Sequence, residues 1–528
     1  MTGLAGLARL AARRERAVAP WWVLLIVALG LAMVGYINRN MGTYELKLAY
    51  LGIIRDNAFL QGLGGREVEP RLEVLATWRS GGFLYVASAF AAVLAVVRHT
   101  RAEEDAGRAE LVRSAVVGRH AQLAAAVLAA AGTGVAGGLA VALALIGAGL
   151  EPGGSLAYGA AVAAAGWVFT GVAAVAAQLA RHARTATAIG LSVLGVSYVM
   201  RYAGDATGQG WLVALSPLGW SELVRPYQDE RWWMLGVLVA AGAALLGLAR
   251  RLLARRDLGA GLLPERLGRA RAPELRGPVS LAWRLHRGLL VKWAAGVASF
   301  AAAAAALSPL ARDLLARPSV VADNIRNTLG VPPEGTLAAY SWYLVLILAY
   351  AVALYPVLMV LRLRAEETSG RAEAVQATTV TRLRWAAGHL LVTGLGTAAL
   401  LAVAGLVFGA LYAALVGGLA DVPRFLGGAL AAVPAVWCVG AVCVLGYGLL
   451  PRASAALSWA VWVLTAALGQ VAGPLYGLWG GSPLEPLHYV PNAFGPAPLA
   501  AGPLLALLAV TAALLGGGLL ALRRRDFG

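Results

Sequence analysis

Two short blocks carry the residues whose types and spacing best suit a specific interaction. Residues 101–119 read RAEEDAGRAELVRSAVVGR and residues 364–382 read RAEETSGRAEAVQATTVTR, and the two agree at 11 of 19 positions. Each block places carboxylates and arginines around one glycine. Such carboxylates can accept hydrogen bonds from the arginines or lysines of a protein that approaches the small residue closely. The repeated pattern therefore predicts two docking sites for a partner protein, although a single copy would be interpreted as a solvated loop helix.

If each block is one helix, Glu104 and Arg108 form an i,i+4 pair, as do Glu367 and Arg371, with the glutamates in the first helical turn. In each block the first glutamate, the glycine and the last glutamate then share one face. The predicted docking residues are Glu103, Glu104, Gly107, Arg108 and Glu110 in the first block, and Glu366, Glu367, Gly370, Arg371 and Glu373 in the second.

The sequence lacks the residues of a nucleotide-hydrolysing site. It contains only two lysines, Lys47 and Lys292, which follow Leu46 and Val291. Neither can be the lysine of a G-x-x-x-x-G-K-[ST] phosphate loop, because that motif needs a glycine directly before it. We therefore expect no catalytic site, metal or cofactor in this chain. If ATP drives the protein, ATP and Mg²⁺ are bound by a separate subunit.

Two other classes of function stay open at this point. An ion-coupled secondary transporter usually carries Asp or Glu within its membrane spans, and none of the spans expected below contains an acidic residue. A polytopic membrane glycosyltransferase needs carboxylates close to a membrane surface. Two expected loops do contain acidic residues without a recognisable catalytic spacing, so solvated loop charges are the default interpretation: Asp56, Glu67, Glu69, Asp205 and Glu222.

Composition places the protein in a membrane. Of the 528 residues 59% are hydrophobic and only 13% are charged, against roughly 25% charged in soluble domains, and the mean hydropathy is +0.71. This excludes a soluble enzyme and a secreted disulfide scaffold, and Cys438 and Cys443, in one apolar segment, are expected to be buried free thiols. The net charge of +17 comes mostly from arginines between apolar segments, a topology signal that excludes nucleic acid as a partner.

Twelve apolar segments are expected to cross the membrane as helices. They lie at residues 20–38, 81–98, 121–149, 158–180, 185–203, 233–249, 290–309, 340–361, 386–416, 425–449, 453–472 and 501–521. With the N-terminus inside, 30 of the 44 Lys and Arg residues fall on the cytoplasmic side and 12 on the other. Because basic residues stay inside, both termini are expected in the cytoplasm.

The chain is expected to be an internal duplication. Pro217–Trp220 corresponds to Pro486–Tyr489, and Arg256–Gly259 corresponds to Arg525–Gly528. These matching segments follow the two blocks in the same order in each half. Because each half has six spans, an even number, the halves are expected to be parallel repeats. The expected domains are a first six-helix half at residues 1–249, an Arg/Pro-rich cytoplasmic linker at 250–280 and a second six-helix half at 281–528.

These features resemble a known family. Glu103 to Leu111, followed by Val117-Gly118-Arg119, is similar to the E-x-E-x-G-x-x-E-L…P-V-x-R signature of ABC exporter permeases. The whole chain resembles the double-length permeases that export polyketide antibiotics and other drugs from actinobacteria. The usual proline is replaced by Val116 in the first block and Thr379 in the second, and Ala374 stands where the first block has Leu111.

The resemblance implies how such a protein works. Each block would be a coupling helix seated on one of two copies of a cytoplasmic ATP-binding subunit. Residues 4–16 and 279–289 would be amphipathic elbow helices. Ser216 to Tyr227 and Ser482 to Pro498 would be re-entrant helices, with ordinary outer loops as the alternative. The expected protein is a permease in a bacterial plasma membrane that moves hydrophobic or amphiphilic small molecules outward.

Overall fold

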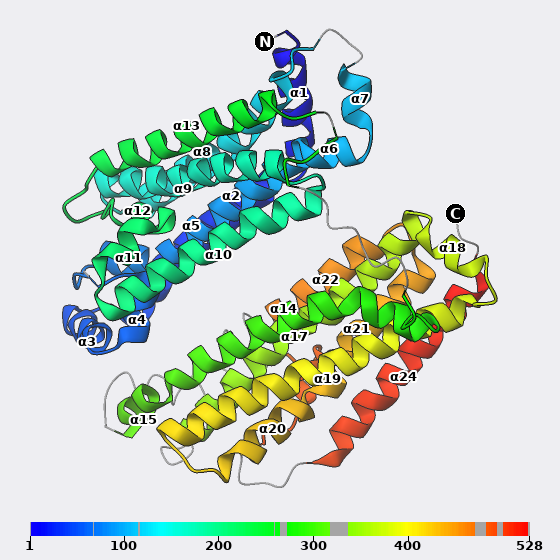
Figure 1. The fold of residues 1–528 in the computed structure, drawn as a ribbon. Helices are drawn as coiled ribbons and strands as arrows, with labels where there is room; N and C mark the ends of the chain where they lie inside the picture. Colours follow the sequence, from blue (N-terminus) through cyan, green and yellow to red (C-terminus); the bar gives the residue numbers. More distant parts are fainter. Residues whose placement is uncertain are drawn as a thin grey trace. The chain divides into compact units, whose positions relative to one another are not determined.

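The computed structural model describes residues 2–66, 68–113, 117–257, 259–263, 272–316, 336–469, 482–493 and 500–525. Helices are the only regular secondary structure in this part of the chain. Eleven helical segments among these residues are long and apolar enough to cross a membrane, which confirms an all-helical, multi-pass membrane fold. The chain separates into two compact units, Met1–Gly268 and Arg269–Gly528, and each is described by itself (Figure 1).

Unit 1 is a bundle of six long helices at the six segments expected to span the membrane. They are α2 (Ala19–Asn40), α5 (Leu72–His99), α8 (Ala121–Gly147), α9 (Pro152–Leu179), α10 (Ala183–Thr207) and α13 (Trp233–Ala254). The shorter helices are α1 (Leu4–Glu15), α3 (Tyr44–Arg55), α4 (Ala58–Gly64), α6 (Arg101–Asp105), α7 (Arg108–Arg113), α11 (Gly210–Leu215) and α12 (Pro217–Glu222). Within this unit α1, α6 and α7 lie at one end of the bundle, and α3, α4, α11 and α12 lie at the other (Figure 1).

Close backbone contact holds the centre of unit 1. Helix α9 packs against α5, α8, α10 and α13, and it meets α8 at Gly138 and Gly159. A Cβ atom on Gly159 would lie 2.2 Å from the carbonyl oxygen of Gly138, and one on Gly138 would lie 2.3 Å from that of Gly159. Both positions therefore require glycine. Such contacts between small residues drive helix association in lipid, where apolar side chains gain little by leaving the bilayer.

Unit 2 has its own hydrophobic core and a similar succession of helices. They are α14 (Pro278–Ala306), α15 (Ser308–Ala316), α17 (Thr336–Thr368), α18 (Arg371–Gln376), α19 (Arg382–Leu415), α20 (Asp421–Ala431), α21 (Val433–Leu449), α22 (Ser454–Ala467), the 3₁₀ helix η3 (Pro486–Tyr489) and α24 (Ala501–Arg524). The expected span at 425–449 is formed by α20 and α21 together. Within the expected span at 453–472 the described residues form helix α22, and Gln470 lies outside the described part of the chain.

The two expected elbow segments differ. Residues 4–16 form the separate helix α1. Residues 279–289 form no separate helix, which corrects the expectation, because they are the first turns of the continuous helix α14. Pro278 occupies the start of that helix, where a missing backbone N–H costs nothing. The sequence between Val279 and Ala306 contains no proline that would interrupt the helix.

Candidate functional site

Each repeated block bends at its glycine. In unit 1, α6 ends at Asp105 and α7 begins at Arg108, with Gly107 between them at φ 71°. In unit 2, α17 runs on to Thr368 and α18 begins at Arg371, with Gly370 at φ 72°. Left-handed backbone favours glycine, so both turns are encoded in the sequence. The expectation of one continuous helix through each block is therefore wrong.

The turn changes which glutamate pairs with which arginine. Arg108 donates to Glu103 through Nε at 2.9 Å and Nη2 at 2.8 Å. Arg371 donates to Glu366 through the same atoms at 2.8 and 3.3 Å. These pairs span five residues, and the expected i,i+4 pairs of Glu104 with Arg108 and of Glu367 with Arg371 are wrong. Hydrogen bonding to Glu103 and Glu366 raises the pKa of Arg108 and Arg371 above the ordinary guanidinium value.

The second glutamate of each block pairs with an arginine far along the chain. Arg256 donates to the two oxygens of Glu104 at 2.9 and 2.8 Å, and both side chains are almost fully buried. In unit 2 Arg525 donates to Glu367 at 2.5 Å. We call these two ion pairs the clasps. Each clasp joins a repeated block to the chain just after the last long helix of its unit, α13 or α24.

Further contacts of the clasps also recur in both units. Arg119 donates to the carbonyl oxygen of Arg256, and Arg382 donates to that of Arg525. The arginine that opens each block reaches a backbone carbonyl: Arg101 donates to Arg181 at 3.3 Å, and Arg364 donates to Arg452 at 3.2 Å. The same set of contacts, built twice from matching positions of the repeat, indicates that the blocks are held rigidly on their bundles.

The remaining predicted docking residues differ in how far they are exposed to solvent. Glu103 is tied to Arg14 of α1 at 2.7 Å as well as to Arg108. Ala109 of α7 and Ala372 of α18 are buried. The exposed members of the predicted set are Gly107, Arg108, Glu110, Gly370, Arg371 and Glu373. Leu111, directly after Glu110, is 75% exposed.

The sequence analysis missed Arg256 and Arg525 as partners of the glutamates. Both residues had been recognised as marks of the duplication, because each opens an R-D-[LF]-G sequence. The sequence did contain one signal for this pairing, because the glutamate and its arginine partner both recur in the second half of the chain. Residues Leu258 and 526–528 of these marks lie outside the described residues.

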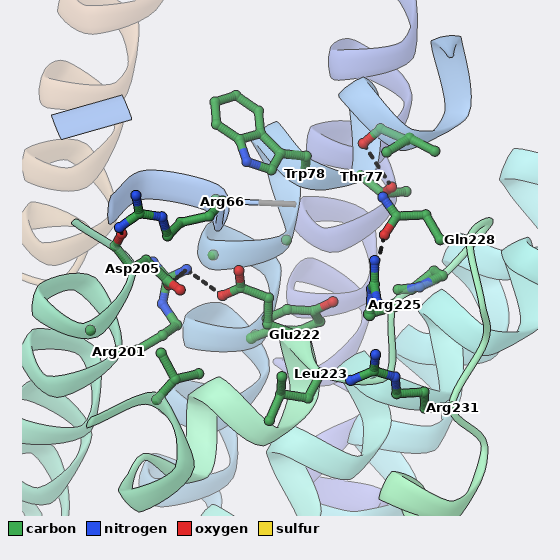
Figure 2. A pocket seen from close by; sticks show the side chains of 18 of the residues that line it. Arg66, Thr77, Trp78, Arg201, Asp205, Glu222, Leu223, Arg225, Gln228 and Arg231 are labelled. Atoms are coloured by element: carbon green, nitrogen blue, oxygen red, sulfur yellow. Dashed lines mark hydrogen bonds and ion pairs between the residues drawn. The ribbon is translucent and has the colours of Figure 1, made fainter. Parts of the chain in front are cut away.

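A polar pocket of about 290 Å³ lies at the end of unit 1 opposite α6 and α7. Its centre is Arg201, which is 1% exposed and donates through Nη1 to Glu222 at 2.7 Å (Figure 2). Through Nη2 it donates to the carbonyl oxygens of Gly62 and Leu63, at 3.1 and 3.0 Å. Those carbonyls belong to the C-terminal turn of α4, where a cation is electrostatically favoured.

The pocket corrects two expectations about acidic residues. Helix α10 continues to Thr207, beyond the expected span end at 203, and so includes Asp205. The expected span at 185–203 contains no carboxylate, but the longer helix that forms it does. Asp205 and Glu222, expected as solvated loop charges, instead both face Arg201, with Asp205 Oδ2 at 3.7 Å from Nη1.

Both proline-rich segments make contacts with their bundles. Ser216 donates to the carbonyl oxygen of Ser197 in α10 at 2.7 Å and caps α12 by accepting from Gly219 N–H. In the segment from 482 to 498, Glu485 is buried and accepts from the Tyr350 hydroxyl at 2.5 Å. Residues 494–499 lie outside the described part of the chain.

These observations define the class as a multi-pass membrane protein in which one helical arrangement occurs twice. The comparison with known families agrees, because the model of "Multidrug efflux system permease Rv1217c, C-terminal domain" matches residues 4–251 and again residues 275–523. The chain belongs to this family, which confirms the resemblance to export permeases and makes it a transporter subunit. It is 40% identical over 534 residues to the "Multidrug efflux system permease protein Rv1217c" of Mycobacterium tuberculosis (strain ATCC 25618 / H37Rv), covering 99% of this chain and 95% of that protein.

Proposed function

We propose that the chain is the transmembrane subunit of an ATP-binding-cassette exporter that moves hydrophobic or amphiphilic compounds out of a bacterial cell. The observation that carries this proposal is the family match to both halves, together with a relative that is named a multidrug efflux permease. ATP and Mg²⁺ would be bound by separate ATPase subunits.

In the proposed topology twelve helices cross the bacterial plasma membrane, with α22 as part of the eleventh. The halves are residues 1–249 and 281–528, joined by a cytoplasmic linker at 250–280, and both termini are cytoplasmic. The excess of Lys and Arg on that side supports this orientation. The segments before the last span of each half would be re-entrant and face outward.

We place one ATP-binding subunit on each repeated block, which makes two copies per permease. Exposed Glu110 and Leu111 offer one subunit a carboxylate and an apolar contact, and Glu373 offers a carboxylate to the other. The clasps make each block stiff: a force on α7 passes through Glu104 and Arg256 to the end of α13. The corresponding path in unit 2 passes through Glu367 and Arg525 to the end of α24.

Co-purification tests the proposal. The tagged chain would be expressed in a bacterium that also makes its neighbouring gene products, purified in mild detergent and assayed for ATP hydrolysis. We expect two copies of a nucleotide-binding subunit per permease and vanadate-sensitive ATPase activity. A permease that exports drugs while purifying alone, without ATPase activity, would refute it.

The coupling residues have their own test. The double variant Glu103→Gln, Glu366→Gln removes the carboxylate that binds Arg108 in unit 1 and the one that binds Arg371 in unit 2. It should uncouple ATP hydrolysis from export and leave membrane insertion intact. The exposed Glu45→Gln variant, in α3 at the opposite end of unit 1, serves as the control. Normal export by the double variant would remove these residues from the coupling mechanism.

Asp205 gives the second candidate, an ion-coupled drug transporter, a specific basis. It is a carboxylate in a membrane-crossing helix and lines a pocket, as ion-relay residues do. The two candidates separate in proteoliposomes. Export that stops with a protonophore and with Asp205→Asn, but continues without ATP, would establish the ion-coupled mechanism.

A further inference from the structure

The polar pocket of unit 1 contains buried polar atoms without hydrogen-bond partners. Arg201 Nε and Asp205 Oδ2 are both buried, and neither makes a hydrogen bond to a described residue, although Asp205 Oδ2 lies 3.7 Å from Arg201 Nη1. Arg201 and Asp205 lie on one helix and both line the cavity (Figure 2). An unpaired buried polar group costs free energy, so such atoms beside a cavity indicate that a polar ligand or ordered water completes them.

The charges around the pocket favour an anion. Among the described residues that line it, four are arginines and two are carboxylates: Arg66, Arg201, Arg225, Arg231, Asp205 and Glu222. Asp229 pairs with both Arg225 and Arg231, at 2.9 Å in each case. With Asp229 included, these residues keep one positive charge in excess. A guanidinium is also the side chain best shaped to bind a carboxylate or phosphate.

Apolar side chains also contribute to the lining of the pocket. Trp78, Val213 and Leu223 line it beside the charged groups. A volume of about 290 Å³ lies at the lower limit for small-molecule sites, which suits a charged head and the first part of a chain better than a whole drug molecule.

Backbone strain occurs in the same wall. Arg225 and Tyr227 have φ values of 52° and 62°, and within the described part of the chain they are the only non-glycine residues with a positive φ. Tyr227 is held there by a hydrogen bond between its hydroxyl and Ser155 Oγ at 2.7 Å. Non-glycine residues in this conformation persist where the surroundings enforce them, which is common around ligand sites. The strain thus fixes Arg225 at the edge of the pocket.

We propose that this pocket binds the anionic head of an amphiphilic cargo molecule, a phosphate or carboxylate attached to an apolar chain. The inference rests on the proposed function and deepens it by naming the cargo's head group. The acceptor oxygens of such a head meet the lining arginines Arg66 and Arg231, while the apolar chain contacts Trp78 or Leu223.

Dodecyl phosphate is the test probe, with dodecanol as its uncharged match. Binding is measured by calorimetry on the permease with its ATP-binding subunits, in nanodiscs of phosphatidylcholine. We expect dodecyl phosphate to bind about tenfold more tightly than dodecanol, as one added charge-assisted contact predicts. Equal affinity of the two probes would overturn the proposal.

The variants replace lining arginines other than Arg201. Arg201 also donates to the carbonyl oxygens at the C-terminal end of α4, so its loss is expected to disturb folding. Arg66→Gln and Arg231→Gln should each weaken dodecyl phosphate binding by about fivefold and leave dodecanol binding unchanged. Arg39→Gln is the matched control, since Arg39 is exposed at the end of α2 and does not line the pocket. An equal loss in Arg39→Gln would mean attraction to surface charge only and would refute the site.

Two further measurements distinguish a cargo molecule from a membrane lipid as the occupant of the pocket. If phosphatidylglycerol in the nanodisc abolishes dodecyl phosphate binding, the occupant is a membrane lipid head and the cargo assignment fails. Stimulation of ATP hydrolysis by dodecyl phosphate in the wild type, lost in Arg66→Gln, supports the assignment. A co-purified ATPase without selective phosphate binding refutes the pocket alone, whereas selective binding without any ATPase refutes the proposed function.

Discussion

Glu104 and Arg256 are 152 residues apart in the chain and form a two-point ion pair with N–O distances of 2.9 and 2.8 Å. The pair has a counterpart in Glu367 and Arg525. A duplicated contact between such distant positions is the main structural result, because it ties the repeated block of each unit to the last long helix of the same unit.

Breaking the first clasp should destabilise unit 1. Glu104→Gln keeps the side-chain volume but leaves Arg256 buried with an unpaired charge, which typically costs about 3–5 kcal/mol. Thermal unfolding in detergent, followed by size-exclusion chromatography, should show a clearly lower midpoint. Glu110→Gln, an exposed carboxylate of the same block, should leave the midpoint unchanged. A wild-type midpoint for Glu104→Gln would contradict the structural role of the clasp.

A side chain at either glycine turn should destabilise the turn modestly. Gly107→Ala meets no atom within 4 Å, so its cost is purely conformational, about 1–2 kcal/mol for left-handed backbone. The same holds for Gly370→Ala. We expect a modest fall in unfolding temperature and a larger loss of drug-stimulated ATP hydrolysis, because a straightened block displaces α7 or α18.

Gly52 in α3 is the control for these glycine variants. It lies within a helix and also has open space around it, so Gly52→Ala should stabilise slightly or have no effect. Equal destabilisation by Gly52→Ala and Gly107→Ala would show that the positive φ is not the cause.

Exposed Leu111 should contribute to holding the ATP-binding subunit. Leu111 is 75% exposed in the permease, so Leu111→Ser should not affect folding. Because the variant removes an apolar contact with the ATP-binding subunit, association should weaken by about tenfold. The amount of ATPase retained on the tagged permease measures this. Leu419→Ser, 86% exposed between α19 and α20, is the matched control. Loss of the ATPase in both variants would rule out a specific contact at α7.

Glu485 predicts a pH effect on unit 2. Burial raises the pKa of Glu485 above its usual range, opposed by the Tyr350 hydroxyl that donates to it. A raised folded-state pKa means that the protonated form is favoured on folding. Its stabilising contribution is present below the unfolded value of about 4.3 and is lost as pH rises through the higher folded value.

Unfolding temperatures measured from acidic to neutral pH test this directly. Glu485→Gln mimics the neutral carboxyl, so the variant should lose less stability than the wild type as pH rises. Glu45→Gln, an exposed position in α3, should follow the wild-type curve. A parallel pH dependence in Glu485→Gln and wild type would contradict the assignment.

Hydrophobic segment length predicted most of the fold. The long apolar runs placed eleven helices correctly, since any run of that length must satisfy its backbone hydrogen bonds internally in lipid. The helix ends were predicted less well. Helix α10 continues through polar Asp205, which lies 3.7 Å from Arg201 Nη1, a contact that hydropathy does not record. The break at Gly107 was missed for a similar reason, because glycine inside a helical pattern is common and its φ depends on the fold.

The site was predicted only in part. The duplicated block was found from sequence, but its pairing was assigned by helical spacing and the actual pairs do not follow it. Arg108 joins Glu103 across a turn, and Arg256 reaches Glu104 from another helix end. Contacts between residues far apart in the chain leave no local pattern in the sequence. The only indication of the clasp was that both its glutamate and its arginine recur in the second half.

The clasp also fixes an order of events during synthesis. Glu104 emerges from the ribosome long before Arg256, and α8, α9, α10 and α13 lie between them. The clasp of unit 1 cannot close until Arg256 has been made, so until then the block of unit 1 is held only by its earlier partners, such as Arg14. A chain whose later helices insert wrongly would lack the Glu104–Arg256 pair, and this block would then be more accessible to cellular proteases.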